Sequence, residues 1–196
     1  MSMGGNKAVF LDRDGTINIE KHYLYKVSDF EYRDGALEGL KSLTDMGYIL
    51  VIVTNQSGIA RGYYTVNDYV NLDQWFKNDL AQRGIHISGS YFCPHLPGGA
   101  ISEYAKECDC RKPKTALFWR AARELNIDMN QSFAVGDKER DLSICNESGV
   151  KGILLSENHL ESEKYVVCAD WEHVIETIKK QEVQQDGKDR RDFTTE

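Results

Sequence analysis

The 196-residue chain lacks any apolar stretch long enough to resemble a transmembrane helix, and no apolar run follows a basic region at its start. It also lacks a basic patch long enough to follow a phosphate backbone, and its formal net charge is −7. Neither an internal repeat nor a long exposed apolar helix is visible. We therefore expect a cytoplasmic monomer whose partner is neither a membrane nor a nucleic acid.

We expect no disulfide framework either, because five cysteines are an odd number and the start of the sequence does not resemble a secretion signal. Three of the five, Cys93, Cys108 and Cys110, lie within 18 residues together with His95. A Cys-x-His pair followed after 12 residues by Cys-x-Cys supplies three sulfurs and one nitrogen, which suits a closed tetrahedral zinc site. The pattern predicts structural Zn²⁺, and the alternative is a group of free thiols.

Strand-like and helix-like segments alternate along the chain. Apolar runs predict strands at 7–12, 48–53, 87–92, 132–136, 152–155 and 165–168, and helical periodicity predicts helices at 35–46, 65–82, 115–125, 140–148 and 171–180. The alternation predicts an α/β fold with a central parallel sheet and helices on both faces. We expect a single domain over residues 1–180, with the zinc loop at 93–110 as an insertion. Residues 181–196 have no apolar face and are expected to be a disordered tail.

Polar residues follow several of these strands. Asp12 and Asp14 come after the first strand, Thr54 after the second, and Asp137 after the strand at 132–136. In open parallel sheets, ligands bind beyond the carboxyl ends of the strands. Together with Lys112, these residues predict a pocket for a divalent cation and a phosphate. Taken one at a time, each has a plain alternative as a turn residue or a solvated surface residue.

The pocket suggests a chemistry. Asp12 is placed to attack phosphorus and form an aspartyl-phosphate, and Asp14 is placed to protonate the leaving oxygen and then activate water. Mg²⁺ held by Asp12, Asp137 and the backbone carbonyl of Asp14 would offset the repulsion between carboxylate and phosphate. The Thr54 hydroxyl and the Lys112 ammonium would bind the equatorial oxygens of the phosphoryl group.

Four motifs resemble those of the haloacid dehalogenase superfamily of phosphohydrolases: Asp-Arg-Asp-Gly-Thr at 12–16, Val-Thr-Asn at 53–55, Arg-Lys-Pro at 111–113 and Gly-Asp-Lys-Glu-Arg-Asp at 136–141. More narrowly, residues 7–180 are similar to the D-glycero-D-manno-heptose 1,7-bisphosphate 7-phosphatase family, most specifically at 53–62, 93–95 and 108–113. The resemblance implies a haloacid-dehalogenase-like Rossmannoid fold. It also implies magnesium-dependent removal of the 7-phosphate in ADP-heptose synthesis for the lipopolysaccharide core, with Asp12 as nucleophile and Asp14 as acid and base.

The resemblance further implies a set of contacts to a small phosphorylated sugar and a metal set. The implied substrate contacts are Glu20, Lys21, His22, Tyr23, Thr54, Asn55, Gln56, Ser57, Arg111, Lys112 and Lys138, and the implied magnesium residues are Asp12, Asp14 and Asp137. Arg61 and Arg111 are candidates to meet a second phosphate, although Arg61 alone also suits a solvated loop. Asp141 either supports the metal shell or is an acid at a helix N-terminus, and both interpretations stay open.

Spacing limits what covers the site, and departures from the family pattern keep other substrates open. The 42 residues from Asp12 to Thr54 and the 58 from Thr54 to Lys112 leave no room for a cap domain, so residues 17–33 and the zinc loop are expected to cover the site.

Two segments depart from the family pattern. Lys-Thr-Ala-Leu at 114–117 replaces the usual Pro-Gly-Met, and His-Tyr-Leu at 22–24 replaces Gly-Tyr-Val. The first departure resembles the histidinol-phosphatase branch, so histidinol-phosphate phosphatase is the alternative. A polynucleotide 3′-phosphatase and a non-catalytic zinc module are less favoured.

Overall fold

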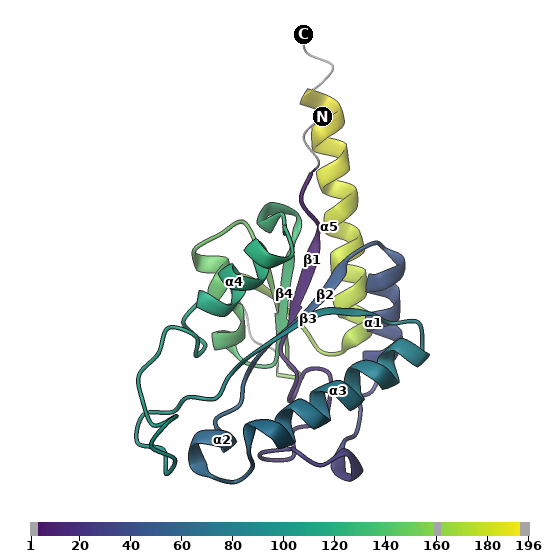
Figure 1. Ribbon diagram of the computed structural model, residues 1–196. Helices are drawn as coiled ribbons and strands as arrows, with labels where there is room; N and C mark the ends of the chain where they lie inside the picture. The colour runs from purple at the N-terminus through teal and green to yellow at the C-terminus, as the bar shows by residue number, and fades with distance from the viewer. Residues whose placement is uncertain (1–3, 159–161, 193–196) are drawn as a thin grey trace.

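A computed structural model describes residues 4–158 and 162–192. Within these ranges the strands are β1 (Ala8–Leu11), β2 (Ile49–Asn55), β3 (Ile87–Cys93), β4 (Phe133–Gly136), β5 (Lys151–Leu155) and β6 (Tyr165–Cys168). They form one parallel sheet in the order β3-β2-β1-β4-β5-β6 (Figure 1). The predicted parallel sheet is therefore confirmed, with β1 and β2 near its centre.

Helices cover both faces of the sheet, as predicted. The α-helices are α1 (Ala36–Asp45), α2 (Gly58–Arg61), α3 (Val66–Gln82), α4 (Ala116–Glu124) and α5 (Trp171–Asp192), and the 3-10 helices are η1 (Val27–Asp29), η2 (Met129–Gln131) and η3 (Glu139–Asn146). One apolar cluster joins the sheet to α1, α3 and α5, and a second joins the opposite face to α4 and η3. Figure 1 shows α4 and α5 on opposite sides of the strands.

The central strands read as continuous apolar runs because both of their faces are buried. Along β1, Val9 and Leu11 pack in the cluster that contains α1, whereas Ala8 and Phe10 pack in the cluster that contains α4. All four side chains are at most 1% exposed. Burial on two faces is typical of parallel sheets and removes the alternation of apolar and polar residues seen in half-exposed strands.

Helix α3 begins with a reciprocal cap. The Thr65 hydroxyl accepts a hydrogen bond from the backbone N–H of Asp68, and the Asp68 carboxylate accepts one from the backbone N–H of Thr65. The hydrogen bond from the Thr65 backbone N–H, and then the one that the Thr65 hydroxyl donates to the same carboxylate, lower the pKa of Asp68. The capping box satisfies two amides that the helix itself leaves unpaired.

Four local features differ from the sequence prediction. β2 continues through Thr54 and Asn55, past the predicted end of the strand at residue 53, and the short helix α2 follows where no helix was predicted. The predicted helix at 140–148 is the 3-10 helix η3. The last helix runs to Asp192, beyond residue 180 where the tail was expected to begin, and an ion pair of 2.6 Å joins its Glu182 to Lys7. Residues 193–196 of the expected tail lie outside the described residues.

The segments that lead from β1 to α1 and from β3 to α4 contain little regular structure. Among the described residues, the stretch from β1 to α1 holds only loop and the 3-10 helix η1, and the stretch from β3 to α4 holds only turns. Neither forms a separate cap domain, in agreement with the spacing argument. In the part of the chain that the structure describes, no helix is both long and apolar enough to cross a membrane.

Candidate active site

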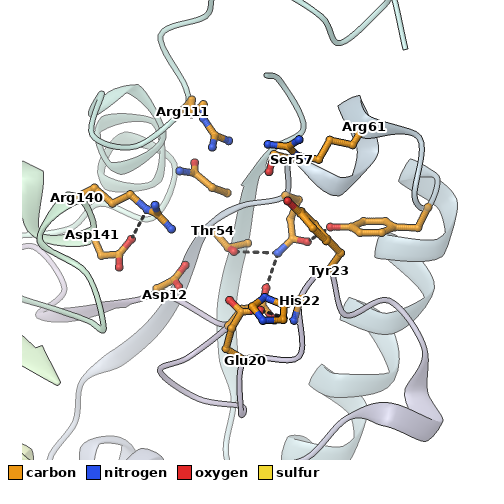
Figure 2. A pocket seen from close by; sticks show the side chains of 14 residues that line it. Asp12, Glu20, His22, Tyr23, Thr54, Ser57, Arg61, Arg111, Arg140 and Asp141 are labelled. Carbon is orange, nitrogen blue, oxygen red and sulfur yellow. Dashed lines mark hydrogen bonds and ion pairs between the residues drawn. The ribbon is translucent and has the colours of Figure 1, made fainter. Parts of the chain in front are cut away.

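The predicted strand-end residues meet at one edge of the sheet. β1 ends at Leu11, so Asp12 is the first residue past the strand, and its backbone N–H still donates to the Val135 carbonyl of β4 at 3.1 Å. β2 brings Thr54 to the same edge, and Figure 2 shows Asp12 and Thr54 facing one pocket. Residues that line this pocket are Asp12, Asp14, Glu20, His22, Tyr23, Thr54, Asn55, Gln56, Ser57, Arg61, Tyr64, Arg111, Arg140 and Asp141.

Lys112 lies at the centre of the charged groups. Its Nζ is 2.7 Å from an Asp12 oxygen and 2.7 Å from an Asp141 oxygen, and it donates to the Val53 carbonyl at 2.6 Å. The Lys112 side chain is only 1% exposed. Two carboxylates and a carbonyl within 2.7 Å therefore hold the buried ammonium in a well-defined position.

Burial and charge set the protonation of this group. Removal from water raises the pKa of Asp12 to about 7; Lys112 opposes the shift, and the neighbouring Asp141 and Asp14 add to it. Burial lowers the pKa of Lys112, but Asp12 and Asp141 outweigh that effect and raise it. The ammonium is therefore charged at neutral pH, and with no metal ion bound Asp12 is poised between its two forms.

Asn55 fixes the backbone of Lys112 from the neighbouring strand. The amide of Asn55 donates to the Lys112 carbonyl at 3.1 Å, and its oxygen accepts from the Lys112 N–H at 3.0 Å. This two-way contact joins the end of β2 to the segment that follows the cysteine loop. Asn55 lines the pocket, as expected, and its side chain also holds the chain segment that carries Lys112.

The Asp14 carboxylate is surrounded by donors. Arg13 Nη2 lies 2.9 Å from Oδ2, Gln56 Nε2 donates to Oδ2 at 2.8 Å, and Asn18 Nδ2 donates to Oδ1 at 3.1 Å. The Arg13 side chain is fully buried. The Asp14 carboxylate is therefore held by three donors, and it is not part of the group formed by Asp12, Asp137 and Asp141.

Three carboxylates are close enough together to hold one cation. Oxygens of Asp12, Asp137 and Asp141 all lie within 4.8 Å of one another. A Cβ on Gly15 would lie 2.5 Å from an Asp137 oxygen, so glycine at this position lets the two segments approach closely. An all-oxygen donor set is the kind that Mg²⁺ prefers. Asp141, and not the Asp14 side chain, completes this group, and Asp14 is left with its backbone carbonyl as the predicted ligand.

The cysteine loop brings its four predicted ligands together. The sulfurs of Cys93, Cys108 and Cys110 and Nδ1 of His95 lie within 4.8 Å of one another. Cys93 Sγ is 3.6 Å from Cys108 Sγ and 3.1 Å from Cys110 Sγ. Four zinc bonds at tetrahedral angles place sulfurs about 3.8 Å apart. The donor set therefore fits Zn²⁺, and β3 positions its first member, Cys93, beside Asn55 of β2.

The loop that follows β1 has an unusual backbone conformation where it lines the pocket. His22 and Tyr23 have positive φ values of 49° and 67°, and the His22 N–H donates to the Glu20 carboxylate at 2.8 Å. Two consecutive non-glycine residues in the left-handed region are costly, and such strain is concentrated at functional sites. The Arg61 guanidinium lies 5.7 Å from the centre of the Tyr23 ring, and both point into the space shown in Figure 2.

Most of the predicted site residues line the pocket, and a few do not. Outside the zinc site, the exceptions are Lys21, which forms an ion pair of 2.8 Å with Glu31, Lys138, which forms one of 2.6 Å with Asp137, Asp137 itself, and the buried Lys112. Arg140 and Tyr64 line the pocket although sequence reasoning gave them no role. Their sequence signal is that Arg140 lies within the motif at 136–141 and that Tyr64 stands two residues after the stretch at 53–62.

Comparisons with known proteins agree with this geometry. The HAD-hydrolase-like family model matches residues 109–179. A D-glycero-beta-D-manno-heptose-1,7-bisphosphate 7-phosphatase of Pasteurella multocida is 48% identical over 149 residues, which cover 76% of this chain and 80% of that protein. The alpha-anomer enzyme of Photorhabdus laumondii is 43% identical over 158 residues, covering 80% and 86%.

A solved structure extends the agreement to the whole fold. D,D-heptose 1,7-bisphosphate phosphatase from B. bronchiseptica, complexed with magnesium and phosphate, superposes with a TM-score of 0.75 at 29% identity. The match covers 89% of this chain and 99% of that one. The strand-end carboxylates, the buried lysine and the four-ligand loop together with these relatives lead to one assignment: the chain belongs to the D-glycero-D-manno-heptose-1,7-bisphosphate 7-phosphatase family of haloacid-dehalogenase-like hydrolases.

Proposed function

We propose that this protein is a magnesium-dependent phosphatase that removes the 7-phosphate of D-glycero-D-manno-heptose 1,7-bisphosphate in the synthesis of lipopolysaccharide core precursors. The observation that carries the proposal is the Asp12 carboxylate, which lies 2.7 Å from the buried Lys112 ammonium at the pocket that Thr54 also lines. A buried carboxylate beside a fixed cation at the edge of a polar pocket suits nucleophilic attack on phosphorus.

The first step is proposed to be transfer of the phosphoryl group to Asp12. An Asp12 oxygen attacks phosphorus, the bond from phosphorus to the sugar oxygen breaks, and protonated Asp14 gives its proton to the departing alkoxide. Lys112 and the Thr54 hydroxyl offer positive charge and a hydrogen bond to the equatorial oxygens, where charge develops in the transition state. The products are an aspartyl-phosphate and the sugar alcohol.

The second step is proposed to be hydrolysis. Asp14, now ionised, takes a proton from water, and the resulting hydroxide attacks phosphorus and releases Asp12 and inorganic phosphate. Gln56 and Asn18 donate hydrogen bonds to the Asp14 carboxylate and hold it in place for this step. When bound by Asp12, Asp137 and Asp141 with the Asp14 carbonyl, Mg²⁺ supplies charge neutralisation for the approach of anion to anion.

We propose that the far end of the substrate meets arginines. Arg61 and Arg111 line the pocket from α2 and from the cysteine loop, and Figure 2 shows both near its upper rim. Neither has a carboxylate partner among the ion pairs of the described residues. Guanidinium groups match phosphate geometry in a bidentate way, so they are suited to a second phosphate. The zinc loop then acts mechanically, because Arg111 and Lys112 directly follow its last ligand, Cys110.

The proposed setting is the cytoplasm, with the chain working as a monomer on a small phosphorylated sugar and not on a nucleic acid or a membrane. The net charge of −7 and the lack of a basic patch favour a small anionic substrate that binds in a local pocket, and they disfavour a long polyanion such as a nucleic acid.

The proposal is tested by measuring phosphate release with Mg²⁺ from the two anomers of heptose 1,7-bisphosphate and from histidinol phosphate. We expect a clear preference for a bisphosphate, whereas a preference for histidinol phosphate would refute the sugar assignment. Asp12→Asn should abolish turnover with the fold intact, because an amide is a poor nucleophile. Asp45→Asn, at an exposed position in α1, is the matched control and should keep wild-type activity.

A further inference from the structure

Tyr64 is a pocket residue to which the proposed chemistry gives no task. It follows α2, is 6% exposed and lines the pocket. Its ring occupies space that Gly58 leaves open, since a Cβ on Gly58 would lie 2.2 Å from Tyr64 Cε1. On its other side the ring stacks on Tyr25 of the loop after β1, with centroids 5.4 Å apart and planes 15° apart. The position of the Tyr64 ring is therefore fixed by packing from two segments.

The Tyr64 hydroxyl acts on Gln56. It donates to Gln56 Oε1 at 2.5 Å, in a buried contact. The other end of the same amide, Nε2, donates to Asp14 Oδ2 at 2.8 Å and to Thr54 Oγ1 at 3.0 Å. The dashed contact at Thr54 in Figure 2 belongs to this network. One buried amide thus connects the tyrosine to a carboxylate and a hydroxyl of the pocket.

Orientation of the Gln56 amide matters because its two ends have opposite polarity. If the amide rotated by half a turn, its oxygen would face the Asp14 carboxylate, and two acceptors would be in contact without a proton between them. A donated proton from Tyr64 holds the oxygen end in place, so the NH₂ end stays directed at Asp14 and Thr54. Gln56 is 2% exposed, so water does not offer an alternative partner.

We propose that Tyr64 is a positioning residue that acts through Gln56. Its role is to keep Asp14, the proposed acid and base, in a fixed position relative to the phosphate-binding hydroxyl of Thr54. The inference rests on the proposed function, since it gives these two groups their chemical roles. Arg13 and Asn18 also hold Asp14, but they come from the same chain segment as Asp14 itself. The Gln56 contact is the one that ties Asp14 to β2 and hence to Thr54.

The first test is Tyr64→Phe, which keeps the ring and its packing and removes only the hydroxyl. We expect kcat to fall about ten-fold while KM changes less than about two-fold, because proton transfer and phosphoryl orientation suffer more than substrate binding. Tyr69→Phe is the matched control: it removes another buried tyrosine hydroxyl, whose partner is Ser90 at 3.4 Å, and should leave kcat unchanged. A change in KM alone, or an equal loss in both variants, would overturn the proposal.

A double-mutant cycle tests whether Tyr64 acts through Gln56. In a Gln56→Met background there is no amide to orient, so adding Tyr64→Phe should cause no further loss of kcat. The same ten-fold loss in both backgrounds would mean that Tyr64 acts by another route. If Gln56→Met does not fold, Gln56→Glu replaces it. Its side chain accepts from Tyr64 but, when ionised, offers Asp14 no proton, so the same absence of further loss is expected.

The two proposals fail in different ways. Wild-type turnover of heptose bisphosphate reports on the proposed function, whereas the ratio of variant to wild-type kcat reports on Tyr64. If the wild-type protein prefers another phosphate monoester, the ratios are measured with that ester, and the inference stands or falls on them alone. A wild-type protein that hydrolyses no monoester would overturn both.

Discussion

Asp12→Asn is expected to change the pH dependence of stability in addition to abolishing turnover. Burial raises the pKa of Asp12 from 3.8 to about 7, against the opposing effect of Lys112. As the pH rises above 4, the unfolded chain releases this proton while the folded chain retains it. The stabilisation gained from the proton is complete below pH 4 and is lost as the pH rises through 7. The asparagine variant has no proton to lose at this position.

The size of the effect follows from the width of the pH window. Each pH unit between the two pKa values changes the free energy of unfolding by about 1.4 kcal/mol, so the wild type loses about 3 kcal/mol relative to the variant between pH 5 and pH 7. For a domain of this length, 1 kcal/mol corresponds to about 2–4 °C in melting temperature. The melting temperature of Asp12→Asn should therefore gain about 6–12 °C on that of the wild type over this range.

Thermal melting of the zinc-loaded protein from pH 5 to pH 8, first without and then with Mg²⁺, measures this difference. Added Mg²⁺ should remove most of it, because a bound cation favours ionised Asp12. Asp68→Asn is the control: its lowered pKa keeps that carboxylate ionised throughout the range, so its difference from the wild type should not change with pH. A flat difference for Asp12→Asn without Mg²⁺ would refute the argument that burial governs this carboxylate.

Three further changes test the metal loop and the core. Cys110→Ser should give a protein with little bound zinc by metal analysis and at least about ten-fold slower phosphate release, because the segment that carries Lys112 then loses its anchor; full zinc content would contradict this. Ser132→Ala removes the buried hydroxyl that accepts from the Ala8 N–H at 3.0 Å, and should cost about 1–3 kcal/mol in urea unfolding. Gly39→Ala places a Cβ 2.5 Å from the Trp171 ring and should cost about 1–3 kcal/mol in the same assay, whereas an unchanged midpoint would show that the ring can move.

Much of the fold could be predicted because the local patterns agree with the tertiary arrangement. β1 and β2 are buried on both faces, so their apolar runs predict central parallel strands without knowledge of their neighbours. Patterns were less informative where side-chain contacts decide the local geometry. η3 differs from the predicted helix in a region where the Asp141 carboxylate accepts from the Lys138 N–H and also pairs with Lys112.

The same distinction between local pattern and tertiary contact applies to the active site. Spacing alone predicts that Asp12, Thr54 and Asp137 reach one edge of the sheet, because parallel strands end together. Spacing says nothing about where a side chain turns once it is there. The Asp14 carboxylate contacts Arg13 and Asn18 of its own segment and also Gln56, which is 42 residues away in the sequence, so its direction depends in part on a distant segment.

The sequence by itself therefore determined the α/β class, the residues of the catalytic edge and the four zinc ligands, because each depends on residue type and on spacing along the chain. Only the tertiary structure decided that Asp141 joins Asp12 and Asp137, that Lys112 is shared between two carboxylates, and that Tyr64 reaches Asp14 through Gln56. These are contacts between side chains carried by different strands and loops. Which side chains meet depends on how the folded backbone brings these segments together. The distances between side chains of different segments cannot be predicted from the periodicity or the motifs of the sequence.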